Sequence, residues 1–87
     1  MAVIIKMPKL GLTMEEGTIS EWYKSEGDFV NEGDLLFAVE TEKVANDVEC
    51  ETEGVLRKII AKQGETVKCG EAVAIIADLN EDISAIS

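Results

Sequence analysis

Few residues in this chain could do chemistry, because it contains no histidine. Without imidazole there is no Ser-His-Asp triad, no histidine general base and no histidine metal ligand. Cys50 and Cys69 lie far apart and form no CxxC pair, so we expect two reduced thiols rather than a disulfide framework. Glu15 and Glu16 form a charge cluster in a loop, without the signs of an acid–base pair. The sequence therefore predicts no catalytic residue and no metal site of its own.

One lysine, Lys43, stands between two strand-like segments. Residues 35–41 are largely apolar, and residues 44–48 alternate in polarity. Two such segments around a short polar break are typical of a β-hairpin, which places Lys43 at the tip. A lysine amine in water is protonated at neutral pH, and no neighbouring base is present to activate it. We therefore interpret Lys43 as an attachment point that another enzyme modifies. The plainer alternative is an ordinary solvated turn lysine.

Length and charge narrow the classes of protein. The 87 residues are enough for one domain. The net charge of −10 argues against nucleic acid and anionic membrane as partners and permits steering toward a basic partner. No apolar run is long enough to span a membrane, and the first residues lack the pattern of a signal peptide. We expect a soluble cytoplasmic protein.

The elements that would position Lys43 are short strands separated by glycine-containing turns. No segment has the pattern of a long amphipathic helix. Residues 80–87 are polar and weakly patterned, so we predict a domain over 1–79 and the start of a linker or a disordered tail over 80–87. The segments with strand patterns are 3–5, 18–24, the hairpin 35–48, 55–61 and 72–77.

An internal repeat organises the chain. Three glycines recur 37 residues later: Gly17, Gly27 and Gly33 return as Gly54, Gly64 and Gly70. Glycine at fixed spacing marks turns that need positive φ, so we predict two similar β-units related by a pseudo-twofold axis. Counting 37 residues from Lys43 in either direction gives Lys6 and Asn80. On this basis we expect Lys43 at one end of the domain and both termini at the other.

Three segments resemble a known family. The hairpin ETEKV resembles the modification site of lipoyl domains of 2-oxo acid dehydrogenase complexes, where Glu-Thr-Asp-Lys-Ala is usual. MPKLGLTMEEGTISEW resembles the start of such domains, and GDFVNEGDLL is similar to their Gly-Asp-x-Val-x-x-Gly-Asp segment. The resemblance is to the lipoyl domain of a dihydrolipoamide acyltransferase component, in a 2-oxo acid or acetoin dehydrogenase complex. It implies an all-β fold: a flattened barrel or sandwich of two four-stranded antiparallel sheets with twofold internal symmetry.

The resemblance also implies roles for individual residues. Lys43 would take lipoate in amide linkage, flanked by Glu42 and Val44. Glu42 stands where aspartate is usual, and Val44 is bulkier than the usual alanine. A surface loop and one acidic position beside the lysine would contact the dehydrogenase component. These expected contact residues are Leu10, Gly11, Leu12, Thr13 and Glu40.

The function that this resemblance implies is a non-catalytic, swinging-arm carrier. Its partners would be a thiamine-diphosphate-dependent dehydrogenase component, dihydrolipoyl dehydrogenase, an acyltransferase core, and a lipoate ligase or lipoyl transferase. The isolated domain would be monomeric, in the bacterial cytoplasm or, in a eukaryote, the mitochondrial matrix. Alternatives are a biotinyl carrier domain, whose sites usually have methionine on both sides of the lysine, and an unmodified interaction module. A glycine-cleavage carrier is disfavoured because those proteins are larger.

Overall fold

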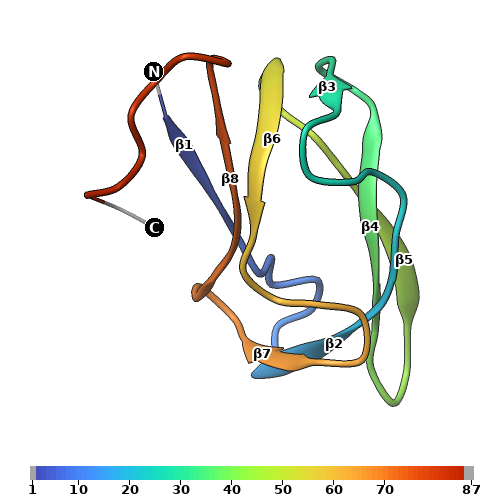
Figure 1. Ribbon diagram of the computed structural model, residues 1–87. Helices are drawn as coiled ribbons and strands as arrows, with labels where there is room; N and C mark the ends of the chain where they lie inside the picture. Colours follow the sequence, from blue (N-terminus) through green and yellow to red (C-terminus); the bar gives the residue numbers. More distant parts are fainter. Residues whose placement is uncertain (1, 86–87) are drawn as a thin grey trace.

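The structure, a computed structural model, describes residues 2–85 and contains eight short strands and no helix in that range. The strands form two four-stranded antiparallel sheets, in the orders β1-β8-β6-β3 and β5-β4-β2-β7 (Figure 1). This arrangement confirms the predicted all-β fold. The strands are β1 (Val3–Lys6), β2 (Glu16–Trp22), β3 (Phe29–Val30), β4 (Leu35–Glu40), β5 (Ala45–Glu49), β6 (Gly54–Ile59), β7 (Thr66–Lys68) and β8 (Ala72–Ala77).

The core lies between the two sheets. Burial alternates along β2, as the period of a strand requires, whereas five consecutive residues of β8 are buried. Trp22 lies at one edge of this core, with its ring centroid 4.9 Å from that of Phe37 and its Nε1 donating a hydrogen bond of 2.8 Å to the carbonyl of Ala61. The fully buried side chains from both sheets include Ile19, Leu36, Phe37, Val39, Leu56, Val73 and Ile76.

Matched hydrogen bonds show the internal twofold symmetry. The amide of Gly27 donates to the carbonyl of Leu56 at 2.7 Å, and 37 residues on, the amide of Gly64 donates to the carbonyl of Ile19 at 2.7 Å. β2, β3 and β4 of the first half thus correspond to β6, β7 and β8 of the second. Each sheet takes strands from both halves, so neither half buries its apolar face alone. The turn glycines of both halves have positive φ: Gly27, Gly33, Gly64 and Gly70, at 96°, 93°, 92° and 90°.

The remaining glycine pair of the repeat, Gly17 and Gly54, allows close packing. Gly17 in β2 is not among the glycines with positive φ, contrary to the expectation that all repeat glycines mark such turns. A Cβ on Gly17 would lie 2.6 Å from Cγ1 of Val39. At the symmetric position, a Cβ on Gly54 would lie 2.9 Å from Cγ2 of Ile76. Both glycines therefore let β2 and β6 approach side chains of the neighbouring strands.

The first strand departs from the 37-residue spacing. Val39 and Ile76 are equivalent in the two halves, because they are 37 residues apart. Val39 pairs with Asn46 and Ile76 pairs with Val3, so equivalent residues of β1 and β5 are 43 apart. The extra residues lie in the connection 7–15 between β1 and β2, which is nine residues long, whereas its counterpart 50–53 has four. The assignment of Lys6 as the symmetry mate of Lys43 was therefore wrong. The connection 7–15 is an asymmetric insertion, called the long loop below.

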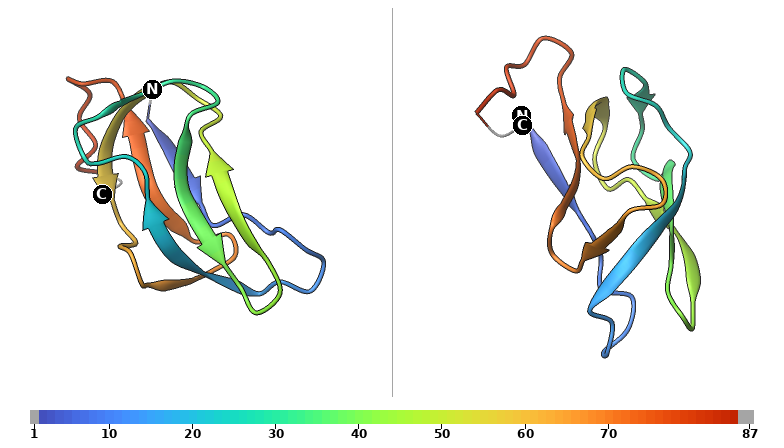
Figure 2. Two further views of the ribbon diagram at one scale, coloured as in Figure 1. Left: turned by 90° about the vertical axis from the view of Figure 1, so that its right-hand side faces the viewer. Right: turned by 60° about the horizontal axis from the view of Figure 1, so that its bottom comes forward.

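The long loop and the β4–β5 hairpin lie side by side at one end of the sandwich. The start of β1 and the end of β8 lie at the opposite end (Figures 1 and 2). For the described residues, this confirms that Lys43 is far from the outer ends of the first and last strands. No helix of the described chain is long and apolar enough to cross a membrane.

The segment after β8 contacts the sheet that β8 belongs to. Nη1 of Arg57, on β6, donates hydrogen bonds to the carbonyls of Asp78 at 2.6 Å and Glu81 at 2.7 Å. These contacts fall on both sides of residue 79. The boundary at 79 and the linker character of 80–87 stay predictions, and residues 86–87 lie outside the described residues.

Candidate functional site

Thr41 shapes the turn that carries Lys43. Its amide donates a 2.8 Å hydrogen bond to the carbonyl of Val44, which closes the four residues between β4 and β5. Its Oγ1 accepts hydrogen bonds from the amides of Lys43 at 3.3 Å and Val44 at 3.2 Å. A threonine hydroxyl that satisfies turn amides in this way fixes a tight turn. The predicted hairpin is confirmed, with Lys43 at its tip.

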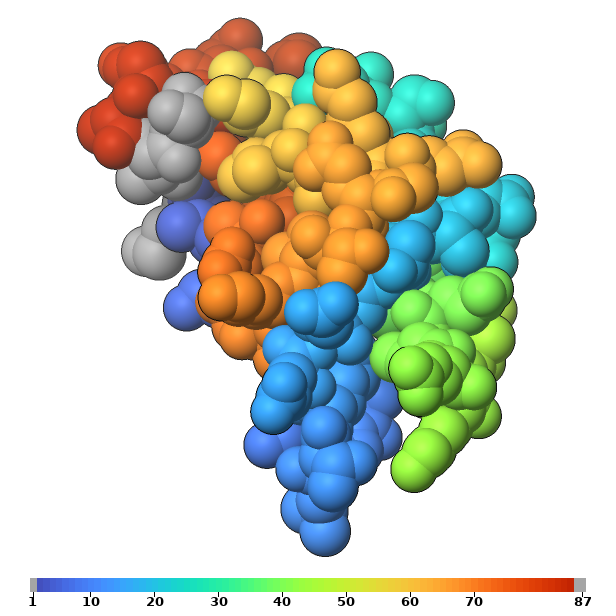
Figure 3. All heavy atoms as spheres, turned by 90° about the horizontal axis from the view of Figure 1, so that it is seen from below, coloured from blue at the N-terminus to red at the C-terminus, as the bar shows by residue number. Residues whose placement is uncertain are grey.

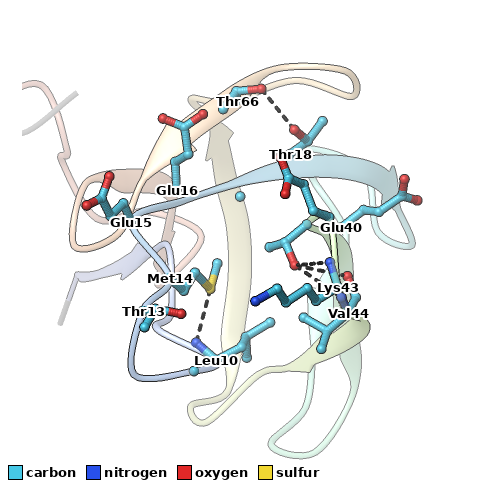
Figure 4. A pocket seen from close by; sticks show the side chains of 14 residues that line it. Leu10, Thr13, Met14, Glu15, Glu16, Thr18, Glu40, Lys43, Val44 and Thr66 are labelled. Carbon is cyan, nitrogen blue, oxygen red and sulfur yellow. Dashed lines mark hydrogen bonds between the residues drawn. The ribbon is translucent and has the colours of Figure 1, made fainter.

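The Lys43 side chain is exposed, and its amine forms no ion pair within residues 2–85. Glu40 and Glu42 lie on the same hairpin and are also exposed. The chain has no histidine, and no carboxylate is buried in the part that the structure describes, so no such group removes the proton of the amine. In Figure 4 the side chain extends from the hairpin toward Leu10 and Met14 of the long loop. The amine is thus accessible to another enzyme, and no group among the described residues would make it a nucleophile.

A groove separates the hairpin from the long loop. It has a volume of about 800 Å³ and is open to solvent. Figure 3 shows the two projections at this end of the molecule with the groove between them. Its lining comes from the long loop (Leu10, Gly11, Thr13, Met14 and Glu15), β2 (Glu16, Gly17 and Thr18), the hairpin (Glu40, Thr41, Glu42, Lys43 and Val44) and β7 (Thr66).

Contacts within the long loop fix it on the body of the domain. The amide of Leu10 donates to Sδ of Met14 at 3.1 Å, and the amide of Met14 donates to the carbonyl of Gly11 at 3.2 Å. Leu10 and Met14 are partly buried and pack against the core. Sγ of Cys69 lies 3.6 Å from the carbonyl of Met14. Leu12, by contrast, is 96% exposed. The loop therefore presents one large apolar side chain to solvent from an anchored base.

The structure places most of the expected site residues in one groove. Leu10, Gly11 and Thr13 lie on its loop side, while Glu40 lies on its hairpin side with Lys43 and its two neighbours. Leu12 lies on the same loop but not in the lining. The sequence reasoning did not include Met14, Glu15, Glu16, Gly17, Thr18, Thr41 and Thr66.

A sequence signal was available for some of these missed residues. Met14 to Thr18 directly follow the expected contact loop, so an extension of that loop would have found them. Thr66 had no such signal, since it reaches the groove by pairing of β7 with β2, where its Oγ1 lies 2.9 Å from that of Thr18. The role of Thr41 becomes clear from the structure, in which its amide closes the turn by donating to the carbonyl of Val44.

The other titratable groups give the site no catalytic machinery. Burial raises the pKa of the Cys50 thiol, which donates to the carbonyl of Thr52 at 2.7 Å. Cys50 and Cys69 are both free. The hydrogen bond from Tyr23 Oη to Oδ1 of Asp47, 2.7 Å long, raises the pKa of Tyr23. Across residues 2–85 no three His, Cys, Asp or Glu side chains are grouped to hold a metal ion.

Comparison with known proteins connects this lysine hairpin to a family. The sequence profile Biotin_lipoyl, described as "Biotin-requiring enzyme", matches residues 3–76. The chain is 38% identical over 88 residues to the dihydrolipoyllysine-residue acetyltransferase component of the pyruvate dehydrogenase complex of Zymomonas mobilis, covering 100% of this chain and 20% of the relative. It is 42% identical over 82 residues to the corresponding component of the acetoin cleaving system of Pseudomonas putida, covering 94% and 22%.

A third relative is a different kind of subunit. The chain is 42% identical over 87 residues to the pyruvate dehydrogenase E1 component subunit beta of Rhizobium meliloti, covering 99% of this chain and 19% of the relative. The chain thus spans about a fifth of the length of these curated relatives. Among solved structures, the lipoyl domain of the 2-oxoglutarate dehydrogenase complex of Azotobacter vinelandii matches with a TM-score of 0.72 and 32% identity, covering 87% of this chain and 98% of that domain.

Proposed function

The chain belongs to the biotin–lipoyl family, and from this premise we propose that it is a lipoyl carrier domain with the lipoyl group in amide linkage on Lys43. The observation that carries the proposal is the placement of Lys43 at the tip of the β4–β5 turn, where it is exposed and forms no ion pair with the described residues. The names of two relatives specify a dihydrolipoyllysine residue. That name supports lipoate over biotin as the attached group.

The chain presents the lysine and leaves the attachment chemistry to a lipoate ligase or lipoyl transferase. Lys43 has no base beside it, so the attaching enzyme removes the proton from the amine. The hydrogen bonds of Thr41 hold the turn in one shape for that enzyme. When bound, the lipoyl group supplies a dithiolane that is reductively acylated and passes the acyl group on. The flexible lysine stem adds reach, and the tether raises the local concentration of the arm at each partner's active site.

The partners we propose are the components of a 2-oxo acid or acetoin dehydrogenase complex. They are a thiamine-diphosphate-dependent dehydrogenase, dihydrolipoyl dehydrogenase and an acyltransferase core, with the domain itself part of the acyltransferase component. Leu12 and its neighbours on the long loop, together with Glu40, would form the contact with the dehydrogenase. The 96% exposure of Leu12 beside the lysine groove supports this role. We place the protein where its complex works, in the bacterial cytoplasm or the mitochondrial matrix.

A biotinyl carrier is the second candidate, because the family description names biotin-requiring enzymes. The residues beside the lysine disfavour it. Glu42 and Val44 stand where biotinyl sites usually have methionine. The third candidate is an interaction module in which Lys43 stays unmodified.

Intact mass separates the three candidates. We would express the chain with a lipoate ligase and, separately, with a biotin ligase. We expect one lipoyl increment with the first enzyme and none with the second. Lys43→Ala should abolish the increment, whereas Lys9→Ala, an exposed lysine on the long loop, should retain it. Biotin addition, or no modification with either enzyme, would contradict the proposal.

A further inference from the structure

The groove beside Lys43 has two chemically different ends. In Figure 4, Leu10 and Met14 of the long loop and Val44 of the hairpin lie around the Lys43 side chain, while Glu16 lies at the far end. All of these residues line the groove. Three apolar side chains thus lie around Lys43 at this end of the groove, with Glu40 and Glu42 also in the lining on the hairpin side. We call Leu10, Met14 and Val44 the apolar wall.

The free amine is poorly matched to the apolar wall. The Lys43 ammonium extends toward Leu10 and Met14, and within the described chain it forms no ion pair with a carboxylate. The Lys43 ammonium is exposed to water and gains no stabilising contact from apolar surface. Acylation of the amine removes that charge and adds an aliphatic chain, which gains from contact with the same surface. The groove is therefore better suited to the acylated lysine than to the free one.

We propose that the groove is a resting site for the acyl arm on Lys43, with the aliphatic chain and the dithiolane ring of the arm held on the apolar wall. This inference rests on the lipoyl attachment proposed above and adds a docked state of the arm to it. The arm then alternates between a docked state in the groove and an extended state that reaches the partner enzymes.

The wall is built firmly enough to serve as a binding surface. Met14 is held by the amide of Leu10, and both side chains pack against the core. A Cβ on Gly17 would lie 2.9 Å from Cε of Met14, so Gly17 leaves the space that Met14 fills. A methionine thioether adapts to irregular apolar ligands. The connection 50–53, which corresponds to the long loop in the second half, is shorter. The apolar wall therefore has no symmetric copy built from that connection.

Val44 is the contribution of the hairpin to the apolar wall. It is 43% exposed and stands directly after the attachment residue. Alanine, the usual residue there in the family that the hairpin resembles, would present a smaller apolar surface to the arm. A covalent tether keeps the arm at high local concentration, so even a weak site is occupied for much of the time. The substitution to valine therefore shifts the arm toward the docked state.

Nuclear Overhauser effects on the lipoylated domain test where the arm lies. We expect contacts from the arm methylenes to the methyl groups of Val44 and Met14. Val44→Ala should weaken the contacts to Met14. Leu79→Ala removes an exposed leucine on the segment after β8, 68% exposed and outside the groove, and should leave them unchanged. An arm without contacts to the long loop would overturn the proposal.

Alkylation of the reduced arm by iodoacetamide measures how often it is docked. An arm docked for three-quarters of the time reacts about fourfold more slowly than free dihydrolipoamide. Val44→Ala should recover about half of that difference, and Leu79→Ala none. Equal rates for the domain and for free dihydrolipoamide would overturn the resting site but leave lipoyl attachment standing. A chain whose intact mass shows no lipoyl group on Lys43 would overturn both.

Discussion

Replacing Gly17 by alanine perturbs the packing that seats the long loop beside the lysine hairpin. A Cβ at this position would lie 2.6 Å from Cγ1 of Val39, 2.9 Å from Cε of Met14 and 3.2 Å from Sδ of Met7. The two contacts with methionine involve unbranched side-chain ends, which adjust at lower cost than a branched side chain. Val39 is fully buried and β-branched, so rotation of its side chain is restricted. The contact with Val39 therefore decides the outcome.

Two opposing effects set the magnitude. Alanine restricts the unfolded chain more than glycine does, which favours folding by about 0.4–1 kcal/mol where the native backbone tolerates it. Gly17 does not have a positive φ, so that gain is available. Inserting a methyl group into a packed core costs about 1–3 kcal/mol. Overpacking wins, and we expect a net loss of about 1–2 kcal/mol in the free energy of unfolding.

Thermal and urea unfolding measure this loss. For a domain of this size, about 1 kcal/mol corresponds to a fall of about 4–8 °C in Tm. Gly11→Ala is the matched control, because a Cβ there meets nothing within 4 Å, and its Tm should not fall. Combining Gly17→Ala with Val39→Ala should give a total loss smaller than the sum of the two, since the truncated valine relieves the contact. A Tm for Gly17→Ala equal to that of wild type, or strictly additive losses, would refute the packing argument.

Three further predictions concern single groups. Lys43→Gln should change the free energy of unfolding by less than about 0.5 kcal/mol, because the side chain is exposed; a large fall in Tm would mean that Lys43 is structural. The amide of Asn31 lowers the pKa of Asp34, so the ionised carboxylate stabilises the fold above the usual aspartate pKa and this contribution is lost as pH falls through the lowered value. Asp34→Asn should therefore flatten the acid side of a Tm-against-pH curve, and an unchanged curve would count against the assignment. Cys50, 1% exposed and with a raised pKa, should react with iodoacetamide at pH 8 more slowly than half-buried Cys69, which peptide mass mapping would check; faster labelling of Cys50 would contradict its burial.

The sequence predicted the hairpin and the twofold repeat well because both depend on local patterns. The apolar residues before Lys43 and the alternating residues after it predicted the hairpin. Both patterns involve only residues that are close together in the chain. The glycines at positions 27, 33, 64 and 70 mark turns that are visible from spacing alone. Strand β3 has two residues and β7 has three, too few for a period-two pattern to be read. Both strands therefore fall in the glycine-containing turns between the segments in which strands were predicted.

The groove was less accessible to prediction, because it depends on which segments meet in space. Lys6 was assigned as the mate of Lys43 because a uniform offset of 37 was assumed. The pairing of Val3 with Ile76 shows that the offset changes at the long loop. The role of Gly17 was also misjudged, since only the structure shows Val39 against it. Residues 10–13 were expected from the family resemblance to contact the dehydrogenase component, whereas the contribution of Thr66 required the β2–β7 pairing.

The most direct test of this account is a fragment mass spectrum of the chain after co-expression with a lipoate ligase. Such a spectrum reports which lysine carries the added mass, and not merely that the chain carries one. The account predicts one lipoyl group, on the peptide that contains Lys43, with Lys9 and Lys68 on the flanking strands and loops unmodified. A lipoyl group on another lysine, or a biotinyl group on Lys43, would contradict it.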